Sequence, residues 1–556
     1  MTDSYWKDIL SFTWAYRTFS GVDQIEKQWS DVTVSAQPRD IRPASGRTPP
    51  RLVRRSANDV VEGFFDFDTH VGHGTGFVRL LPTDFESFEA KAWLLLTTLQ
   101  EIRGSEERVD GRRPTGVEYS TTFAGENWLD QRQHTQKYED RDPEVLIVGG
   151  GQAGLILAAR LGQMGVDALV IEKERRIGDN WRNRYHSLTL HNEVWANSMP
   201  YLPFPPTWPT FLPKDKLAGW LEGYAEYMEL NVWTNTEFIK GGYDKSSRKW
   251  SVTVEVEDGS RRELCVPHLV LATGGTSGVP HVPSLPGLND FEGEVIHSSK
   301  FVSGIPYRSK RAIVVGTGNS GHDVAQDLYD NGAASVTLVQ RSPTCVVSLV
   351  PSGTMVYAIY SEGPSADDID LINAAVPYPI FQESMKWLTE KTCSLDATLL
   401  ENLHEAGFET DFEPDGTGFY MKYLRRGGGY YINVGCSELI ADRKIGLVQA
   451  RDIDTFTSTG LCLNEREIDA DLIVLATGYE NQQEGVRHLL GDDTADRLGP
   501  VWGFDENYVM RNMWQRTNQE SLWIMGGSLI DCRFYSRFLA LQIVASLKGV
   551  IPRHSD

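Results

Sequence analysis

Two stretches decide the fold: EVLIVGGGQAGLILAARLGQMGVDALVIEK at residues 144–173 and RAIVVGTGNSGHDVAQDLYDNGAASVTLVQR at residues 311–341. Each joins an apolar run typical of a strand, a G-x-G-x-x-G turn, a run of helical composition and a second apolar run. The turn glycines are Gly149, Gly151 and Gly154 in the first stretch and Gly316, Gly318 and Gly321 in the second. Such glycines permit a tight turn, close approach of the backbone to a pyrophosphate and close packing of helix on strand, while free N–H groups at the helix N-terminus attract phosphates. The two copies predict an α/β fold with two dinucleotide sites.

The two units differ where the ribose of each dinucleotide is expected to lie. The first unit ends its second apolar run at Glu172, whose carboxylate can accept hydrogen bonds from an unphosphorylated ribose. In the second unit Gln340 falls at the matching position, and Arg341 and Ser342 follow it. A carboxylate would repel a 2′-phosphate, whereas a neutral side chain followed by a guanidinium would attract one. The sequence therefore predicts FAD or NAD in the first unit and NADP(H) in the second.

Length and composition suit a large multidomain enzyme. The 556 residues suggest about three or four domains. A formal charge of −22 and a pI near 5.0 argue against nucleic acid and anionic membranes as partners. Six cysteines occur without a C-x-x-C pair, a pattern that fits neither a disulfide framework, a zinc site nor a redox dithiol. The N-terminus lacks the features of a signal peptide, and no apolar run approaches 18 residues, so we expect a cytoplasmic chain without a membrane span.

Residues 1–140 precede the first unit and are predicted to form a separate small α+β domain. Apolar residues at helical spacing predict a helix within residues 3–19, and a run of strand formers predicts a strand at residues 91–102. His70 and His73 could be metal or acid-base groups, or simply surface imidazoles in a glycine-rich loop. Because no third ligand accompanies them, we predict no metal site.

The remainder of the chain is predicted to form two Rossmann-like domains. We assign residues 141–302 and 440–556 to a discontinuous FAD-binding domain, and residues 303–439 to an NADPH-binding domain. The stretch at about 350–430 is rich in helix formers and interrupted by turn residues, which indicates a helical insertion in the second domain.

Two apolar strands end in the same three residues, Ala-Thr-Gly. The segment at residues 250–274 predicts a β-hairpin turned at Asp-Gly and a further strand that ends at Thr273 and Gly274. The second copy ends at Thr477 and Gly478. Such strand ends are common on their own, but beside two glycine turns they predict backbone close to a cofactor.

The linker FEGEVIHSSKF at residues 291–301 resembles the fingerprint of the class B flavin monooxygenases. These include the flavin-containing monooxygenases, the Baeyer–Villiger monooxygenases, N-hydroxylating enzymes and the plant YUCCA enzymes. The pattern contains His297, but Phe301 and Val302 match neither the Trp-Pro or Trp-Asp ending of the Baeyer–Villiger group nor the Tyr-Lys or Tyr-Arg ending of the animal group. The fingerprint therefore indicates the class and not the subclass.

Further segments resemble the YUCCA-like branch of that class. They are GDNWRNRYHSLTLHNEVWANSMPYLPFPPTWPTFLPKDKLAGWLEGYA at residues 178–225 and GTGNSGHDVAQDL at residues 316–328. The resemblance covers residues 144 to about 547. The first 140 residues lie outside it, but an N-terminal extension of the cone-shaped, nuclear-transport-factor-like fold is familiar among fungal and bacterial relatives.

The resemblance implies roles for particular residues. The residues implied for FAD are Gly149, Gly151, Gln152, Gly154, Glu172, Asp179, Asn180, Trp181 and Arg182. The residues implied for NADPH are Gly316, Gly318, Asn319, Ser320, Gly321, Arg341 and Ser342. We add the strand ends Thr273, Gly274, Thr477 and Gly478, and the linker histidine His297, as cofactor-binding candidates. An equally good interpretation of Asn319 and Ser320 is a helix N-cap pair.

His191 is the candidate for a catalytic polar group near the flavin. Alignment on the following Pro-Phe-Pro places it where animal flavin-containing monooxygenases have an asparagine that positions flavin and NADP⁺. The alternative is a structural histidine that hydrogen-bonds a loop carbonyl.

The resemblance implies a monooxygenase that uses NADPH, FAD and O₂. NADPH would reduce FAD, and a 4a-hydroperoxyflavin would transfer one oxygen atom to a small organic substrate, either at a heteroatom or at a carbonyl in Baeyer–Villiger or oxidative-decarboxylation chemistry. Trp195, Tyr201 and Trp208 together indicate an aromatic or lipophilic substrate, although ordinary core packing is the favoured interpretation for each one taken singly. We expect residues 1–140 to cap the enzyme or to join copies of it in a homo-oligomer.

Two other functions fit parts of the sequence. A pyridine-nucleotide quinone or disulfide reductase shares the plan of two nucleotide sites, but the missing C-x-x-C and the linker at residues 291–301 weigh against it. A non-enzymatic interaction module on a degenerate flavoprotein fits poorly, because the glycines of both turns are intact.

Overall fold

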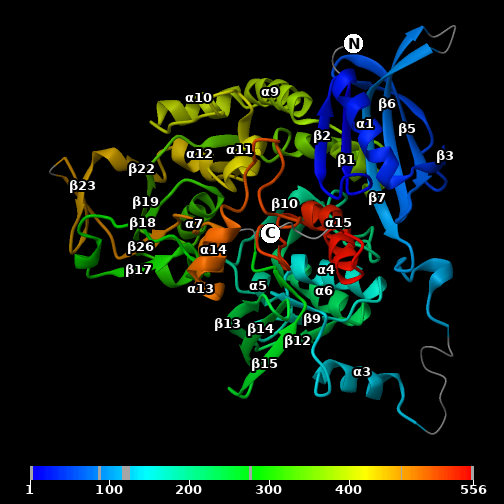
Figure 1. The fold of residues 1–556 in the computed structure, drawn as a ribbon. Helices are drawn as coiled ribbons and strands as arrows, with labels where there is room; N and C mark the ends of the chain where they lie inside the picture. The colour runs from blue at the N-terminus through cyan, green and yellow to red at the C-terminus, as the bar shows by residue number, and fades with distance from the viewer. Residues whose placement is uncertain (1–3, 85–88, 116–124, 275–277, 465, 552–556) are drawn as a thin grey trace.

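Three sheet-based units make up the chain in the computed structural model (Figure 1). The structure describes residues 4–84, 89–115, 125–274, 278–464 and 466–551. Within these ranges no helix is both long enough and apolar enough to cross a membrane.

The N-terminal unit is a seven-stranded sheet with one helix packed on it (Figure 1). The strand order is β2-β1-β7-β6-β5-β3, with β4 paired to β5; β1 and β7 are parallel and the other pairs antiparallel. Its elements are β1 (Tyr5–Ile9), β2 (Tyr16–Ser20), α1 (Val22–Ala36), β3 (Arg39–Pro43), β4 (Arg51–Arg55), β5 (Asn58–Asp68), β6 (Gly72–Asp84) and β7 (Glu89–Ile102). β7 confirms the strand predicted at residues 91–102, and the unit is of mixed α and β structure, as predicted.

The helix predicted within residues 3–19 is wrong, because this segment forms β1 and β2. Trp6 and Asp8 lie two residues apart in β1, on the same face of the strand, and both are fully buried. The Asp8 carboxylate accepts hydrogen bonds from the backbone N–H groups of Phe12 at 3.1 Å and Thr13 at 2.9 Å. These bonds hold the connection between the two strands, so the buried carboxylate stabilises a turn where apolar spacing alone indicated a helix.

The first of two parallel sheets has the order β12-β9-β8-β16-β27. Its strands are β8 (Val145–Val148), β9 (Ala168–Ile171), β12 (Asn231–Trp233), β16 (His268–Leu271) and β27 (Leu522–Ile524). Its associated helices are α3 (Trp128–Lys137), α4 (Gln152–Gln163), α5 (Asp179–Arg182), α6 (Lys214–Tyr227) and α15 (Leu529–Leu547). Two smaller sheets accompany it, made of β10 (Thr189–Glu193) and β11 (Phe211–Pro213), and of β13 (Glu237–Asp244), β14 (Lys249–Glu255) and β15 (Arg261–Val266).

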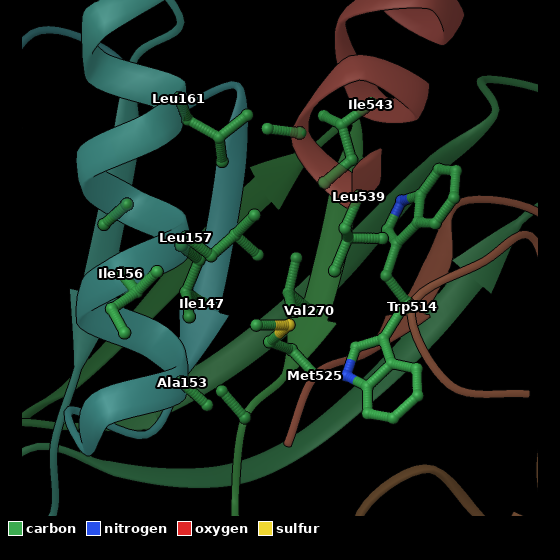
Figure 2. Close-up of a cluster of buried hydrophobic side chains, with 14 of the residues drawn as sticks. Ile147, Ala153, Ile156, Leu157, Leu161, Val270, Trp514, Met525, Leu539 and Ile543 are labelled. Atoms are coloured by element: carbon green, nitrogen blue, oxygen red, sulfur yellow. The ribbon is translucent and has the colours of Figure 1, made fainter. Parts of the chain in front are cut away.

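The core of this unit lies between its sheet and two helices from distant parts of the chain. Figure 2 shows Leu157 of α4 and Leu539 of α15 among the buried side chains around Ile147 and Val270 of the sheet. All four residues of β8 are buried, as expected for a central parallel strand covered on both faces. The C-terminal strand β27 and helix α15 therefore complete the unit that β8 and α4 begin.

The second parallel sheet has the order β17-β26-β18-β19-β22. Its strands are β17 (Glu294–His297), β18 (Arg311–Val315), β19 (Ser335–Gln340), β22 (Gly446–Gln449) and β26 (Leu472–Leu475). The smaller strands are β20 (Cys345–Ser348), β21 (Tyr430–Asn433), β23 (Ile453–Phe456), β24 (Gly460–Leu463) and β25 (Arg466–Asp469). The helices between these strands are α7 (Asn319–Asp330), α8 (Ala366–Ala374), α9 (Tyr378–Leu395), α10 (Ala397–Glu405), α11 (Gly418–Arg426) and α12 (Cys436–Ala441), with a 3₁₀ segment η5 (Gly353–Ser361). Helices α13 (Gln482–Leu490) and α14 (Asp492–Leu498) follow β26 and pack into the core of the first unit.

The two parallel sheets agree with the predicted pair of Rossmann-like units, but the strand pairing does not follow the predicted boundaries. β17, β22 and β26 pair in the second sheet, whereas the predicted FAD-binding domain includes residues up to 302 and from 440 onward. The reason is that each Ala-Thr-Gly strand pairs with the strand that leads into its own glycine turn. β26 pairs with β18, just as β16 pairs with β8. The helices α8 to α11 lie within residues 350–430, where helix formers are abundant in the sequence.

Candidate dinucleotide sites

The first glycine turn lies at the carboxyl end of β8, where a side chain at two of its positions would collide with backbone. Gly149 has a φ of +111°, and a Cβ there would lie 2.4 Å from the carbonyl oxygen of Ala272. A Cβ on Gly154 would lie 2.0 Å from the carbonyl oxygen of Gly149. Helix α4 has Gly151 as its N-cap and no side-chain cap. The turn is therefore built from glycine backbone, with the N–H groups of α4 available to an anion.

Glu172 lies directly after β9 and beside the first turn, as predicted. Its side chain is buried, with Oε2 accepting a hydrogen bond from the Gly150 N–H at 2.7 Å. Oε1 accepts from the Glu174 N–H at 2.9 Å. A carboxylate has about four acceptor positions, so two remain for hydroxyl groups of a ligand.

The G-x-x-W segment forms the short helix α5 next to the first turn. The Trp181 indole N–H donates to Oε1 of Gln152 at 3.3 Å, and the Asn180 amide approaches Gly151. Arg182 instead pairs with Asp179 at 2.8 Å and with Glu222 of α6 at 2.7 Å. Gln152, Asn180 and Trp181 therefore border the turn, whereas Asp179 and Arg182 join α5 to α6.

The second glycine turn repeats the geometry of the first. Gly316 has a φ of +115°, and its Cβ would lie 2.4 Å from the carbonyl oxygen of Ala476. A Cβ on Gly321 would lie 2.0 Å from the carbonyl oxygen of Gly316. Gly318 is the N-cap of α7 and no side chain caps this helix, so the N-cap interpretation of Asn319 and Ser320 is wrong. Asn319 Oδ1 instead accepts from the backbone N–H of Ile432 at 2.9 Å.

Gln340 occupies the position that matches Glu172, because Val315 pairs with Val339 just as Val148 pairs with Ile171. Its side chain is fully buried. The amide donates to the carbonyl oxygen of Glu409 at 2.8 Å and accepts from the Glu409 N–H at 2.9 Å.

Arg341 and Ser342, which follow Gln340, are exposed. In the described part of the chain Arg341 has no ion-pair or hydrogen-bond partner. Gln340, at the position that matches Glu172, is therefore neutral and hydrogen-bonded to backbone, and the Arg341 guanidinium beside it is available to a ligand.

The linker histidine acts on the loop that follows β26. His297 is buried, and its Nε2–H donates to the carbonyl oxygen of Gly478 at 3.0 Å while Nδ1 accepts from the Ser299 N–H at 3.1 Å. Burial lowers the pKa of His297. The Thr477 hydroxyl donates to the carbonyl oxygen of His281 in the same region. His297 therefore positions Thr477 and Gly478 rather than pointing at the second turn itself.

The first Ala-Thr-Gly end is held from the C-terminal part of the chain. The Gln482 side-chain amide donates to the carbonyl oxygen of Gly274, and Gly526 packs against the same carbonyl. Thr273 lies next to Ala272, whose carbonyl oxygen faces Gly149. Both Ala-Thr-Gly ends thus face the glycine turn of their own sheet.

His191 lies in β10, half-buried, next to η5. Burial lowers its pKa to about 4, so the imidazole is neutral near pH 7. Among the described residues it has no hydrogen-bond partner, so the bond to a loop carbonyl considered above is not formed. His191 is available as a neutral donor and acceptor beside the first unit.

Sequence patterns missed a group of tyrosines from four elements, which we call the tyrosine cluster. Its members are Tyr357 of η5, Tyr420 and Tyr423 of α11, Tyr430 of β21 and Tyr535 of α15. All are half-buried, and burial raises the pKa of each hydroxyl. The clustering of aromatic residues in residues 419–431 was the available signal.

A buried histidine near the second turn, His322, is expected to make the stability of the folded protein sensitive to acid. His322 of α7 stacks on Tyr431, with ring centroids 3.8 Å apart, and Nδ1 lies 3.1 Å from the carbonyl oxygen of Gly318. Burial lowers its pKa to about 4. The unfolded chain takes up this proton near pH 6.5, so the folded state loses stability as pH falls from 6.5 toward 4, by about 1.4 kcal/mol per pH unit.

When the pH is lowered from 7.5 to 5.5, we therefore expect the thermal unfolding midpoint of His322→Phe to decrease less than that of the wild type. Phenylalanine keeps the ring stack and removes the titrating group. Differential scanning fluorimetry at both pH values measures the two decreases, and equal decreases would contradict the assignment.

Comparisons with known proteins agree with this architecture of two glycine turns on two parallel sheets. A family model described as flavin-binding monooxygenase-like matches residues 142–359. The chain is 31% identical over 340 residues to the probable indole-3-pyruvate monooxygenase YUCCA9 of Arabidopsis thaliana, which covers 60% of this chain and 75% of that protein. It is 28% identical over 338 residues to the probable indole-3-pyruvate monooxygenase YUCCA10 of the same plant, covering 61% of this chain and 82% of that protein.

Among solved structures, the chain resembles an OTEMO complex with FAD and NADP, with a TM-score of 0.53 and 20% identity, over 74% of this chain and 86% of that one. At this identity the likeness shows the fold alone. Fold and turns thus define a class of α/β proteins with two nucleotide-binding sheets. Within that class the chain belongs to the flavin-binding monooxygenase-like family, and it is a flavin-dependent monooxygenase by descent.

Proposed function

We propose that this protein is an NADPH-dependent, FAD-containing monooxygenase that transfers one oxygen atom of O₂ to a small organic substrate. The observation that carries the proposal is the pair of glycine turns with identical close approaches and different ribose positions, Glu172 in one and Gln340 followed by Arg341 in the other. The monooxygenase relatives and the FAD and NADP of the solved OTEMO complex support it.

The residues around the first turn fit FAD. The contacts of Gly149 and Gly154 leave no room for side chains between the turn and its sheet, and the N-terminus of α4 points its N–H groups where a pyrophosphate would lie. Glu172 would hold the ribose hydroxyls, and Gln152, Asn180 and Trp181 would border the flavin side of the site. Thr273 and Gly274 lie at the adjoining strand end.

The residues around the second turn fit NADPH. Gly316, Gly318 and Gly321 would receive the pyrophosphate at the N-terminus of α7, where Asn319 is already held by β21. Arg341 would pair with the 2′-phosphate, since it is exposed and Gln340 beside it carries no charge.

FAD, once reduced by NADPH, would supply the oxygen chemistry, and the protein's own residues bind, orient and exclude water. Glu172, which accepts a hydrogen bond from the Gly150 N–H, would also hold the adenosine end, and His297 holds the Gly478 carbonyl after β26. His191 remains a neutral hydrogen-bonding group at pH 7 because burial lowers its pKa to about 4. A neutral imidazole can donate from one nitrogen and accept at the other without adding charge to the site.

We propose that the N-terminal unit is a cap on the catalytic body. Arg47 pairs with Asp368 of α8 at 2.9 Å, and the Tyr16 hydroxyl donates to the carbonyl oxygen of Trp514 at 3.2 Å. These contacts join the unit to α8 and to the segment that precedes β27. The disulfide-reductase alternative is disfavoured, since the six cysteines include no C-x-x-C pair.

The first test is the cofactor content of the purified protein. We expect yellow protein with about one FAD per chain, or colourless protein that takes up added FAD with a flavin absorption spectrum. Protein that binds no FAD under either condition would refute the proposed function.

A further inference from the structure

Four of the five members of the tyrosine cluster lie near one carboxylate, that of Asp531. Asp531 lies in the first turn of α15 and acts electrostatically on Tyr357, Tyr420, Tyr423 and Tyr535. The Tyr423 hydroxyl donates to Asp531 Oδ2 at 3.1 Å. Residues from η5, α11 and α15 thus converge on a single acidic group.

This region lies between the two glycine turns. On one side, Gln152 at the start of α4 donates to the carbonyl oxygen of Gly527 at 3.4 Å, and Gly527 packs against Asp531. On the other side, Tyr423 contacts Tyr430, with ring centroids 6.4 Å apart, and the Asn319 side chain at the start of α7 lies against the Tyr430 hydroxyl. A molecule held here would lie between the helix N-termini of both dinucleotide sites.

One oxygen of Asp531 remains unused. Oδ2 accepts from the Ser528 N–H at 2.9 Å, from the Ser528 hydroxyl at 2.8 Å and from Tyr423. Oδ1 has no hydrogen-bond partner within the described ranges and is not among the fully buried unpaired atoms. The hydroxyls of Tyr420 and Tyr535 are likewise without partners there. The hydrogen bonds to Oδ2 orient the Asp531 carboxylate. Its Oδ1 and the hydroxyls of Tyr420 and Tyr535 are then available to a ligand.

The surrounding charges are acidic. Besides Asp531, the carboxylates of Glu193 and Asp370 act on Tyr357 and Tyr535 respectively. The arginine on the same helix, Arg533, is already in a buried ion pair with Asp370 at 2.8 Å. Burial raises the pKa of Asp531, and a bound ammonium group would favour its ionised form, whereas a ligand carboxylate would meet like charge.

We propose that Asp531 is a specificity-determining residue that selects aromatic substrates with an ammonium group and discriminates against aromatic carboxylates. The tyrosine rings supply the apolar and π contacts for the aromatic part, and Asp531 Oδ1 accepts from the nitrogen. The inference rests on the proposed function in taking this region as the substrate site. It separates this chain from the relatives named for indole-3-pyruvate, which is a carboxylate.

Three probes with a shared indole ring test the inference: tryptamine, tryptophol and indole-3-acetate carry positive, no and negative charge. Isothermal titration of the FAD-loaded protein with each probe measures binding without turnover, so the result does not depend on oxygen transfer. We expect tryptamine to bind at least tenfold more tightly than indole-3-acetate, with tryptophol between them. Equal affinities, tighter binding of indole-3-acetate, or no binding of any probe would overturn the inference.

Asp531→Asn is expected to reduce the preference for tryptamine over indole-3-acetate by at least tenfold, because asparagine keeps an oxygen for Ser528 and Tyr423 but removes the charge. Tyr423→Phe should keep the preference, since it removes a donor and leaves the carboxylate. Glu193→Gln is the matched control, a second carboxylate that acts on Tyr357. If Glu193→Gln abolishes the preference and Asp531→Asn does not, the assignment to Asp531 is wrong. If Asp531→Asn does not fold, the wild-type affinities decide.

Discussion

Replacing Gly154 by alanine is expected to abolish tight FAD binding while the second site still binds NADPH. The added Cβ would lie 2.0 Å from the carbonyl oxygen of Gly149, a distance that forces the turn and α4 apart. Overpacking of this kind costs roughly 1–3 kcal/mol or more, and the displaced N–H groups would no longer face the pyrophosphate. We expect the affinity for FAD to fall by about a hundredfold or more, measured by flavin fluorescence on titration of apoprotein.

Gly162→Ala is the matched control in the same helix. A Cβ at Gly162 meets no atom within 4 Å, so alanine should keep full FAD content and stabilise α4 by about 0.5–1 kcal/mol. Gly321→Ala should show the reverse selectivity, with FAD retained and NADPH weakened, because its Cβ would lie 2.0 Å from the carbonyl oxygen of Gly316. Equal FAD content in Gly154→Ala and Gly162→Ala would contradict the proposed first site.

Arg341→Ala is expected to weaken NADPH far more than NADH. The guanidinium is exposed and directly follows Gln340, whose amide is engaged with the backbone of Glu409. A hydrogen-bonded pair with a charged group contributes about 1.5–3 kcal/mol, which corresponds to a rise of roughly tenfold to a hundredfold in KM for NADPH. The KM for NADH should change less than about twofold, because NADH has no 2′-phosphate.

Arg451→Ala is the matched control for the guanidinium. Arg451 is also exposed and lies near the same edge of the sheet, but it pairs with Glu409 at 2.6 Å. Its removal should affect NADPH and NADH alike. Equal losses for the two nucleotides in Arg341→Ala would show that the ribose interpretation of the second site is wrong.

The two nucleotide units could be predicted from sequence because their signal is local. In each, a strand, three glycines, a helix and a second strand lie within about thirty residues, and the spacing itself carries the geometry. The different second-strand ends also lie close to their turns, so Glu172 and Gln340 fall at matching positions as predicted. The burial of Gln340 against Glu409 could not be predicted, since the two residues are far apart in the chain.

The rest depended on contacts between distant segments. The segment at residues 3–19 has helical spacing, but the buried Asp8 and the pairing with β7 favour strands over helix. The sheet membership of β17 and β26 follows from pairing with β18 rather than from composition. The tyrosine cluster and Asp531 combine residues from 357 to 535, and no local pattern links them.

The central claim, oxygen transfer driven by NADPH on a flavin, is tested most directly with isotopically labelled oxygen. FAD-loaded protein would be mixed with NADPH and ¹⁸O₂ in the presence of tryptamine and, separately, of thioanisole as a neutral sulfide. Mass spectrometry would follow the organic product, and a peroxidase assay the hydrogen peroxide. We predict one ¹⁸O atom in the product of at least one probe, with NADPH and O₂ consumed in equal amounts. Recovery of all the consumed oxygen as hydrogen peroxide, with no label in either organic product, would contradict the account.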